Sequence, residues 1–331
     1  MPNLEQLAAS VRGAPALQAK RELALVRRLP AAADGDDGAL VPHAGGFLVV
    51  CGEALHPGFV RSDPHAAGAA AVVTNAADVR AMGGRPLALV DMLVSPDRAH
   101  AEAVLDGLAW AAGLLGVDLV GGHLTIGHEA ALSASCTGVT ARPLRSGEAR
   151  PGDALLAAFA LEGRYRGDTA FFSSLRHRSA GQLRDDGQAL VEVAEAGLCR
   201  AARDVSMSGV AGSLLQLIEA AGCGATLDLD RLPRPVRVPV ERWLLTFPSF
   251  GFLLAVPPER LAAACEPFRR RGLACAECGR LDDSGVLRLA AGDREAPVWD
   301  LGREAFTGLG PKQPARPAAQ GKASPDRGRS P

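Results

Sequence analysis

One stretch of the sequence most constrains how this chain can fold. It is rich in Ala and Val, and a glycine pair separates it from a strand pattern that follows directly. Residues 63–82 read as a helix, and residues 86–94 read as a strand. Gly83 suits the left-handed position that follows a helix, and after Gly84 the next strand can start at once. This order predicts an α/β fold in which the helix carries one acid, Asp78, near its C-terminal end.

The same mixture of helix and strand patterns recurs on both sides of a turn at residues 151–153. The chain has 331 residues, of which 47% are hydrophobic, and this is enough for two domains with cores of their own. The predicted organisation is an N-terminal helical segment at 1–30, a first α/β domain at 31–148, a second α/β domain at 149–300, and a disordered Pro-, Gly- and Ala-rich tail at 308–331.

Spacing and capping signals give the remaining elements. Further helices are predicted at 4–29, 95–116, 186–204, 208–222 and 238–247, and residues 250–272 read as a strand followed by a helix. Further strands are predicted at 45–52, 117–123, 131–141, 154–161, 225–230, 273–281 and 285–292. The predicted N-caps are Asp63, followed by Pro64, and Ser95, followed by Pro96. The glycines Gly121 and Gly122 are expected to close their strand.

The composition excludes several classes of protein. The formal net charge is −1 and aromatic residues make up 4%, so neither a nucleic-acid-binding surface nor a base-stacking platform is predicted. No apolar run is long enough to span a membrane, and the N-terminus lacks a secretory pattern. We therefore expect a cytoplasmic protein with a small-molecule substrate, no nucleic-acid partner and no membrane partner.

The seven cysteines are scattered and do not form a disulfide framework. Cys275 and Cys278 form a C-x-x-C pair, for which redox chemistry or metal binding is one interpretation. A zinc site would need two more ligands nearby, and none follows in the sequence. The alternative is that both are small residues in a half-buried strand.

Several acids stand beside turns and glycines, where they could hold a divalent cation. Carboxylates gathered without matching Lys or Arg repel one another unless a cation lies among them. Carboxylates on loops suit Mg²⁺, and glycines beside them let a triphosphate approach the backbone. The candidates are Asp36, Asp37, Glu53, Asp78 and Asp204, together with Asn75, which shares a helix face with Asp78.

Each candidate also has a plain structural interpretation. Asp36 and Asp37 suit a turn, Asp78 suits a solvated helix surface, and Asp204 suits a helix cap. Gly121 and Gly122 before His123 suit a strand-end turn. The chain has no Walker loop, no G-x-G-x-x-G and no nucleophile elbow.

Six stretches, taken in order, resemble one superfamily. They are GDDGALV (35–41), NAADVRAMGGRPLALVDML (75–93), VGGHLTIG (120–127), PGDALLAAF (151–159), DVSMSGVAGSLLQLIEAAG (204–222) and FPSFGFLLAVPPE (247–259). Their order and spacing are similar to those of the aminoimidazole ribonucleotide (AIR) synthase superfamily. Its members include thiamine-monophosphate kinase, selenophosphate synthetase, the hydrogenase-maturation dehydratase and formylglycinamidine synthase. The chain most resembles the AIR synthase-related branch.

The resemblance implies a PurM-like two-domain α/β (α+β) fold. In that fold the N-terminal domain forms a dimeric β-barrel and binds ATP with a C-terminal α/β domain, so a homodimer is expected. Asp36 and Asp37 match the family's metal-binding GDD, and Asp78 matches another metal ligand. The resemblance further implies nucleotide contacts from Asn75, Gly83, Gly84, Gly121, Gly122 and Ser206, and a catalytic or substrate-supporting role for Asp204.

Three positions depart from the family pattern. His123 stands where many members have Asp, Glu53 stands where an Asp would be, and Met207 replaces an acid of thiamine-monophosphate kinase. Imidazole suits proton transfer better than Mg²⁺ binding, so His123 is a candidate general base, or else a replacement that fills space. Glu53 would assist the metal through a longer side chain.

Three functions follow as hypotheses. The first is ATP- and Mg²⁺-dependent phosphoryl transfer to, or phosphoryl activation of, a small metabolite, with thiamine-monophosphate kinase-like activity as a specific alternative. The second is a nucleotide-binding sensor without turnover. The third is a redox or metal-handling protein that uses Cys275 and Cys278.

Overall fold

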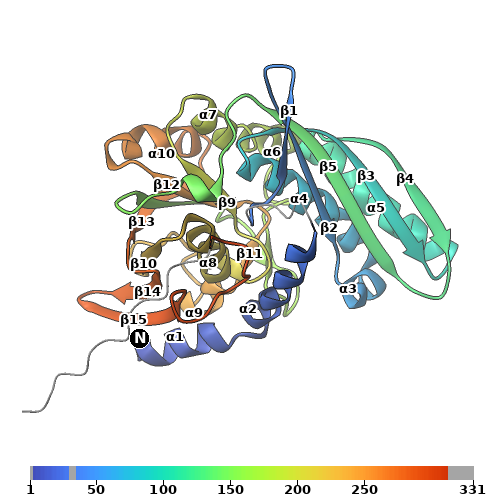
Figure 1. Cartoon of the computed structure of the whole chain (residues 1–331). Helices are drawn as coiled ribbons and strands as arrows, with labels where there is room; N and C mark the ends of the chain where they lie inside the picture. Colours follow the sequence, from blue (N-terminus) through green and yellow to red (C-terminus); the bar gives the residue numbers. More distant parts are fainter. Residues whose placement is uncertain (1–2, 30–34, 312–331) are drawn as a thin grey trace, which may run out of the picture.

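The computed structural model describes residues 3–29 and 35–311 of the chain. Its strands form a five-stranded sheet, a seven-stranded sheet and a small three-stranded sheet. The first domain, built on the five-stranded sheet, lies beside the second domain, built on the seven-stranded sheet (Figure 1). The predicted mixed α/β class is confirmed.

Helices cover one face of the five-stranded sheet and leave the other face open. Helices α4 (Pro64–Ala81) and α5 (Arg98–Leu115) pack on the covered face, and α3 (Pro57–Ser62) precedes them. In order across the sheet, the strands are β1 (Ala39–His43), β2 (Gly46–Ala54), β5 (Ala131–Thr140), β3 (Arg85–Ser95) and β4 (Asp118–Ile126).

Side chains alternate along β3 as a sheet of this kind requires. Leu89 and Leu93 are buried beneath the helices, whereas Val90 and Met92 point to the open face and are 37% and 44% exposed. The described strands leave β1 and β4 as free edges. The sheet is therefore open in the single chain, and the dimeric barrel stays a prediction.

The seven-stranded sheet of the second domain is buried on both faces. Every residue of its inner strands β6 and β12 is buried. In order across the sheet, the strands are β15 (Arg294–Asp300), β14 (Val286–Ala291), β10 (Gly224–Asp228), β13 (Ala274–Asp282), β6 (Ala154–Phe159), β12 (Gly251–Val256) and β9 (Ala201–Asp204).

Shorter elements complete the second domain. The three-stranded sheet contains β7 (Arg164–Tyr165), β8 (Phe171–Ser173) and β11 (Phe247–Pro248). The helices are α6 (Ala180–Asp186), α7 (Ala189–Glu195), α8 (Gly209–Ala221), α9 (Val240–Leu244) and α10 (Leu261–Arg269), with 3₁₀ turns η2 (Ser146–Glu148) and η3 (Pro258–Arg260).

The N-terminal helical segment packs on the second domain, although it precedes the first. It is divided into α1 (Leu4–Gly13), α2 (Pro15–Ala19) and the 3₁₀ helix η1 (Lys20–Arg28). The break falls at Ala14, which is extended because the following proline disfavours helical geometry at the residue before it. The buried leucines of α1 and α2 belong to the same hydrophobic core as Trp243 and Trp299.

Several predicted boundaries are wrong. Helix α5 begins at Arg98 rather than after Ser95, because the side chain of Asp97 accepts a hydrogen bond from the His100 amide at 2.8 Å. Gly121 and Gly122 lie inside β4, where parallel pairing with β3 continues the strand to Ile126.

The predicted helix at 186–204 divides into α7 and β9. Gly197, with a φ of +65°, follows the end of α7, and Cys199 and Arg200 lead into the strand. The sequence patterns also missed β1 and β15, together with the short strands β7, β8 and β11 and the helices α3 and α6.

The predicted disordered tail begins too early. The buried Glu219 carboxylate accepts hydrogen bonds from the backbone amides of Phe306, Thr307 and Gly308 at 2.7, 2.8 and 3.1 Å. Arg27 donates to the carbonyl of Gly310. Residues 308–311 are thus held on the second domain, and residues 312–331 lie outside the described part of the chain.

The two cysteines of the C-x-x-C pair face away from each other. Both lie in β13, but Cys275 belongs to the core that contains Phe268, and Cys278 belongs to the core that contains Trp299. Neighbouring residues of β6 divide between the same two cores, so the cores lie on opposite faces of the sheet. The interpretation of this pair as a metal or redox site is wrong.

None of the helices within residues 3–29 and 35–311 combines the length and the hydropathy that a membrane span needs.

The tight packing of α4 on α5 yields a stability prediction. A Cβ added at Gly107 would lie 2.0 Å from the His65 carbonyl oxygen, whereas one added at Gly113, also in α5, would meet nothing within 4 Å. Gly107→Ala should lower the free energy of unfolding by about 1–3 kcal/mol through overpacking. Gly113→Ala should raise it by about 0.5–1 kcal/mol through helix propensity. Urea denaturation of both variants checks this, and equal effects would contradict it.

Candidate metal centre

Helix α4 delivers Asp78 to the interior between the two domains. The helix begins with Asp63, whose side chain accepts a hydrogen bond from the Ala66 amide at 3.3 Å, and it ends where Gly83 adopts a φ of +74°. Asp78 is 5% exposed, and its Oδ2 has no hydrogen-bond partner among the described residues. A buried carboxylate oxygen without a hydrogen-bond partner destabilises the folded state, so this position fits a bound cation.

The segment before β1 contributes two more acids. The Asp36 carboxylate accepts a hydrogen bond from the Ser146 amide at 2.8 Å. The Asp37 carboxylate accepts one from the Asp204 amide at 3.0 Å and pairs with the Arg203 guanidinium at 2.9 Å. Both members of this ion pair are almost completely buried. Asp36 is therefore used to join the segment to η2, while Asp37 faces the second domain.

The end of β9 contributes Asp204, which is 5% exposed. Beyond it the chain turns through residues 205–208, where Ser208 adopts a φ of +107°, and α8 begins at Gly209. A Cβ at Gly209 would lie 2.5 Å or less from the backbone of residues 244 and 245, so the turn is packed tightly. This packing fixes the direction in which the strand ends.

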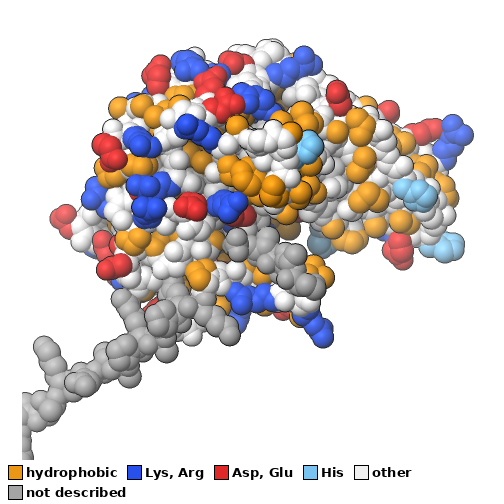
Figure 2. Space-filling model, turned by 45° about the horizontal axis from the view of Figure 1, so that its top comes forward, with side chains coloured by type: hydrophobic (Ala, Val, Ile, Leu, Met, Phe, Trp, Pro, Cys, Tyr) orange, Lys and Arg blue, Asp and Glu red, His pale blue; other side chains and the backbone are white. Residues whose placement is uncertain are grey.

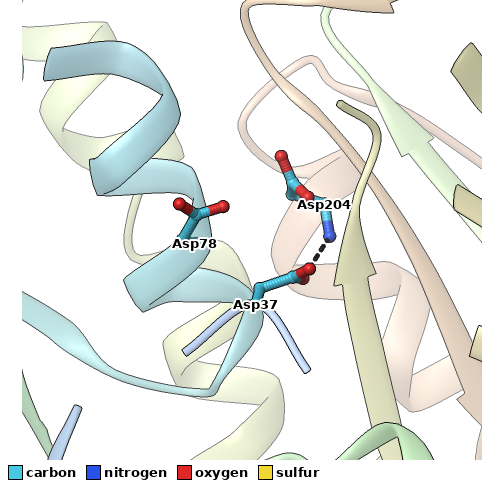
Figure 3. A group of neighbouring side chains, drawn as sticks. All are labelled: Asp37, Asp78 and Asp204. Atoms are coloured by element: carbon cyan, nitrogen blue, oxygen red, sulfur yellow. Dashed lines mark hydrogen bonds between the residues drawn. The ribbon is translucent and has the colours of Figure 1, made fainter. Parts of the chain in front are cut away.

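The three carboxylates converge in space. Asp37, Asp78 and Asp204 each place one oxygen within 4.8 Å of the other two. Figure 3 shows these side chains brought together from the segment before β1, from α4 and from the end of β9. We call Asp37, Asp78 and Asp204 the acidic cluster. Only acids with oxygen ligands meet here, and this is the donor set that Mg²⁺ prefers.

The electrostatics of the acidic cluster are unfavourable without a cation. Burial raises the pKa of Asp78 well above its ordinary value, and the charge of Asp204 raises it further. Burial and the charge of Asp37 likewise raise the pKa of Asp204, against the opposing effect of Arg203. The pKa of Asp37 is raised by burial despite its pairing with Arg203. The residues present therefore fit a divalent cation.

Glu53 lies at the margin of the acidic cluster, on β2. Solvent reaches its side chain, yet the surrounding protein still raises its pKa by desolvation, while Lys20 opposes the shift. The Glu53 charge in turn raises the pKa of Asp78. Glu53 is thus close enough to act on the cluster electrostatically, although it is not one of the three converging carboxylates.

Asn75 and the glycine pair are engaged in local structure. The Asn75 side chain is completely buried, donates to the Ala71 carbonyl at 2.8 Å and lies 3.5 Å from the Cys51 thiol. The amides of Gly83 and Gly84 donate to the carbonyls of residues 80 and 79. These contacts complete the end of α4.

The remaining predicted site residues lie on the first sheet or in the turn after β9. A Cβ at Gly122 would lie 2.1 Å from Asp91 Oδ1, so glycine is required there for packing, whereas nothing lies within 4 Å of a Cβ at Gly121. The Ser206 amide donates to Ser213 Oγ at 3.1 Å.

His123 lines a cavity beside the acidic cluster. It lies on the open face of β4 opposite Met92, and the cavity of about 470 Å³ is also lined by His56 and Met207. Met207 is three residues beyond Asp204, so the turn after β9 borders both features. The structure thus separates His123 from the three carboxylates and places it in an adjoining, largely apolar space.

Sequence reasoning missed two cations near the acidic cluster. Arg203 fell within the predicted helix at 186–204, and only the fold shows its buried pairing with Asp37. The charge of Lys20 opposes the rise in the pKa of Asp37 and Asp204 that burial causes. Lys20 is the only lysine among residues 1–311, and this rarity is the one signal that could have drawn attention to it.

Comparisons with known proteins agree with this architecture of two α/β domains. The N-terminal domain of AIR synthase related proteins matches residues 35–140, and their C-terminal domain matches residues 178–292. The chain belongs to the AIR synthase related family.

Several relatives cover most of this chain. An uncharacterised protein of Synechocystis sp. is 34% identical over 278 residues, which are 83% of this chain and 86% of that protein. The phosphoribosylformylglycinamidine synthase subunit PurL of Methanopyrus kandleri is 29% identical over 81% of this chain and 42% of its own. Selenide, water dikinase of Myxococcus xanthus is 31% identical over 62% of this chain and 61% of its own.

Solved structures share the fold. T. maritima PurL complexed with ATP aligns with a TM-score of 0.75 and 22% identity, over 96% of this chain and 54% of its own. AaThiL complexed with AMPPCP and TMP aligns with a TM-score of 0.62 and 21% identity, over 78% of this chain and 88% of its own. The chain spans about half the length of the PurL structures.

The raised pKa values predict how stability depends on pH. A carboxyl group whose pKa is higher in the folded state destabilises the fold above that pKa, and the destabilisation is lost as pH falls through it toward the unfolded value of 3.8. In metal-free buffer the Tm should therefore rise as pH is lowered from neutral, and Asp78→Asn should weaken this rise and raise the Tm at neutral pH.

Thermal melts from pH 5 to 8 with EDTA or with MgCl₂ check this prediction. Mg²⁺ should raise the Tm of the natural chain at neutral pH and have less effect on Asp78→Asn. Asp118→Asn, at an exposed acid at the start of β4, is the matched control and should behave like the natural chain. A pH dependence unchanged in Asp78→Asn would contradict the electrostatic argument.

Proposed function

We propose that this protein is an ATP- and Mg²⁺-dependent enzyme that transfers a phosphoryl group to a small metabolite or activates the metabolite in that way. The convergence of Asp37, Asp78 and Asp204 carries the proposal, because three buried carboxylates beside one arginine leave excess negative charge. The names of the relatives support it, since they include a dikinase and a synthase subunit solved with ATP.

Each residue of the acidic cluster has a role in this proposal. Asp37, Asp78 and Asp204 would hold Mg²⁺, and Glu53 would assist from the margin. Bound there, the ion would neutralise charge on the ATP phosphates during transfer. Arg203 fixes the orientation of Asp37 through the buried ion pair. Asn75, Gly83, Gly84 and Ser206 set the backbone around the site, and Asp36 anchors the segment that carries Asp37.

The cavity beside the acidic cluster suits the acceptor. We assign His123 as the general base, which takes the proton from an acceptor hydroxyl as its oxygen attacks the γ-phosphorus. The bond from that phosphorus to the β–γ bridging oxygen breaks, and ADP leaves. Gly121 and Gly122 keep β4 free of side chains beside His123. A largely apolar lining with two imidazoles favours an acceptor with an apolar body.

The open face of the first sheet supports a homodimer. Val90 and Met92 on this face are exposed. In Figure 2, hydrophobic side chains outnumber charged ones on the visible face of the first domain, on the right. Side chains of both charges are mixed on the second domain. Pairing of two such faces would bury this apolar surface and both sheet edges.

Nucleotide binding and turnover are the direct test. In isothermal titration, Mg²⁺ and ATP should bind the natural chain together, and Asp78→Asn or Asp204→Asn should weaken binding by at least about tenfold. Mutating a residue that only hydrogen-bonds to a metal ligand typically costs at least about tenfold in metal affinity, and loss of a ligand itself should cost no less. Asp118→Asn should bind as the natural chain does. ATP binding that depends neither on Mg²⁺ nor on these two aspartates would contradict the proposal.

ADP release with a panel of small metabolites then separates an enzyme from a sensor. An enzyme releases ADP faster with one class of acceptor, thiamine monophosphate among those tried, and His123→Asn slows release without weakening ATP binding. If ATP binds and no acceptor stimulates ADP release, the sensor interpretation replaces the catalytic one.

The proposed dimer makes its own prediction. Val90→Glu places a charge on the open face of the first sheet and should convert the dimer to a monomer in light scattering coupled to gel filtration. Val236→Glu, at a residue that is 96% exposed in the second domain, should leave the dimer intact. A natural chain that is monomeric at micromolar concentration would contradict the homodimer.

A further inference from the structure

A second cavity lies at the opposite end of α4 from the acidic cluster. It has a volume of about 260 Å³ and lies where α4 and α5 of the first domain meet the β7–β8 hairpin of the second. The small side chains of Ala66, Ala69 and Ala70 leave room along α4. We call this cavity the arginine pocket, after Arg164, Arg166 and Arg176 in its lining.

The arginine pocket carries a strong positive charge. His65 and His177 line the cavity together with the three arginines, and no Asp or Glu is in the lining. Arg166 is paired with Asp63, whereas Arg164 and Arg176 form no salt bridge within the described ranges. Helix α4 begins at Pro64, so the positive end of an 18-residue helix adds to the same field. Two unpaired guanidinium groups at one cavity suit a phosphate group.

Aromatic side chains form the other part of the lining. Trp110, Tyr165 and Phe171 border the cavity, and the Arg176 guanidinium lies 4.8 Å from the centroid of the Trp110 ring. This cation–π contact holds Arg176 at the cavity instead of leaving it free in solvent. Arg242 lies 3.6 Å from the Tyr165 ring and adds another cation behind it. Aromatic rings beside cations suit a ligand that joins a planar ring to an anion.

The arginine pocket is separate from the acidic cluster. His65 and Asp78 are thirteen positions apart on α4, and a rise of 1.5 Å per residue separates them by about 20 Å. A ligand that fits within the arginine pocket cannot reach across that distance to the three carboxylates. It would instead contact both domains, because α4 and α5 line one side of the cavity and the β7–β8 hairpin lines the other.

We propose that the arginine pocket binds a small organic phosphate monoester that carries a planar ring. Arg164 and Arg176 bind the phosphate, and Trp110 and Phe171 contact the ring. The site is additional to the proposed nucleotide site, and its occupation links the two domains.

Phenyl phosphate is the probe for this proposal, with inorganic phosphate and phenol as its two halves. Binding is followed by calorimetry and by Trp fluorescence, since Trp110 lines the cavity while Trp243 and Trp299 are completely buried. Phenyl phosphate should saturate the natural chain and quench Trp110. Inorganic phosphate should bind at least about tenfold more weakly, and phenol should not saturate the site.

Matched variants separate the arginine pocket from general charge effects. Arg164→Gln combined with Arg176→Gln should weaken phenyl phosphate binding by about tenfold or more. Arg98→Gln, at an arginine of α5 whose side chain is 90% exposed, should leave binding unchanged. Asp78→Asn should also leave it unchanged, which distinguishes this site from the acidic cluster. Trp110→Leu should weaken phenyl phosphate but not inorganic phosphate.

Three results would overturn the proposal. They are no saturable binding of phenyl phosphate, equal binding by the double arginine variant, and equal affinity for phenyl phosphate and inorganic phosphate. Because both arginines are exposed, the double variant should fold, and far-UV circular dichroism verifies this. If the double variant does not fold, Arg176→Gln alone and Trp110→Leu decide the question by the same criteria.

Discussion

The repulsion among Asp37, Asp78 and Asp204 is the constraint on which the rest of the structure depends. Three carboxylates are gathered out of water beside a single buried arginine, and folding brings them together despite the cost. The hydrophobic cores of both domains must supply the free energy that holds them there. A divalent cation bound among the three carboxylates would remove the repulsion. Its binding would therefore be coupled to the free energy of bringing the two domains together.

The dipole of α4 increases the electrostatic difference between its two ends. Asp78 lies near the C-terminal end, where the helix dipole disfavours a negative charge, and this adds to the demand for a cation. The arginine pocket lies at the N-terminal end, where the dipole favours an anion. One helix therefore has opposite electrostatic environments at its two ends, and the close contacts at Gly68 and Gly107 pack it tightly on α5.

Local signals predicted much of the architecture. The cap at Asp63, the glycine pair after α4 and the alternation in β5 are all written in short stretches, and the structure has these elements where the sequence predicted them. The acids were recognised because they stand beside turns and glycines. Their convergence rested on a family resemblance, since no short stretch specifies that residues 37 and 204 meet.

The errors arose where distant contacts decide the local structure. Parallel pairing with β3 carries β4 through Gly121 and Gly122, which local reasoning treated as a turn. Arg203 lies beside the acidic cluster, and its partner Asp37 reaches it from far away in the chain. The carboxylate of Glu219 accepts a hydrogen bond from the amide of Gly308, the first residue of the stretch whose composition predicted disorder. In each case a partner far along the chain overrode the local pattern.

The division of the acidic cluster between the domains has a consequence for how such proteins can diversify. Asp37 and Asp78 come with the first sheet and Asp204 with the second, so neither half carries all three acids of the cluster. If a gene were split between the domains, its two products would form the acidic cluster only when they associate. If two related genes exchanged halves, the product would keep the acidic cluster only if each gene encoded its acids at these positions.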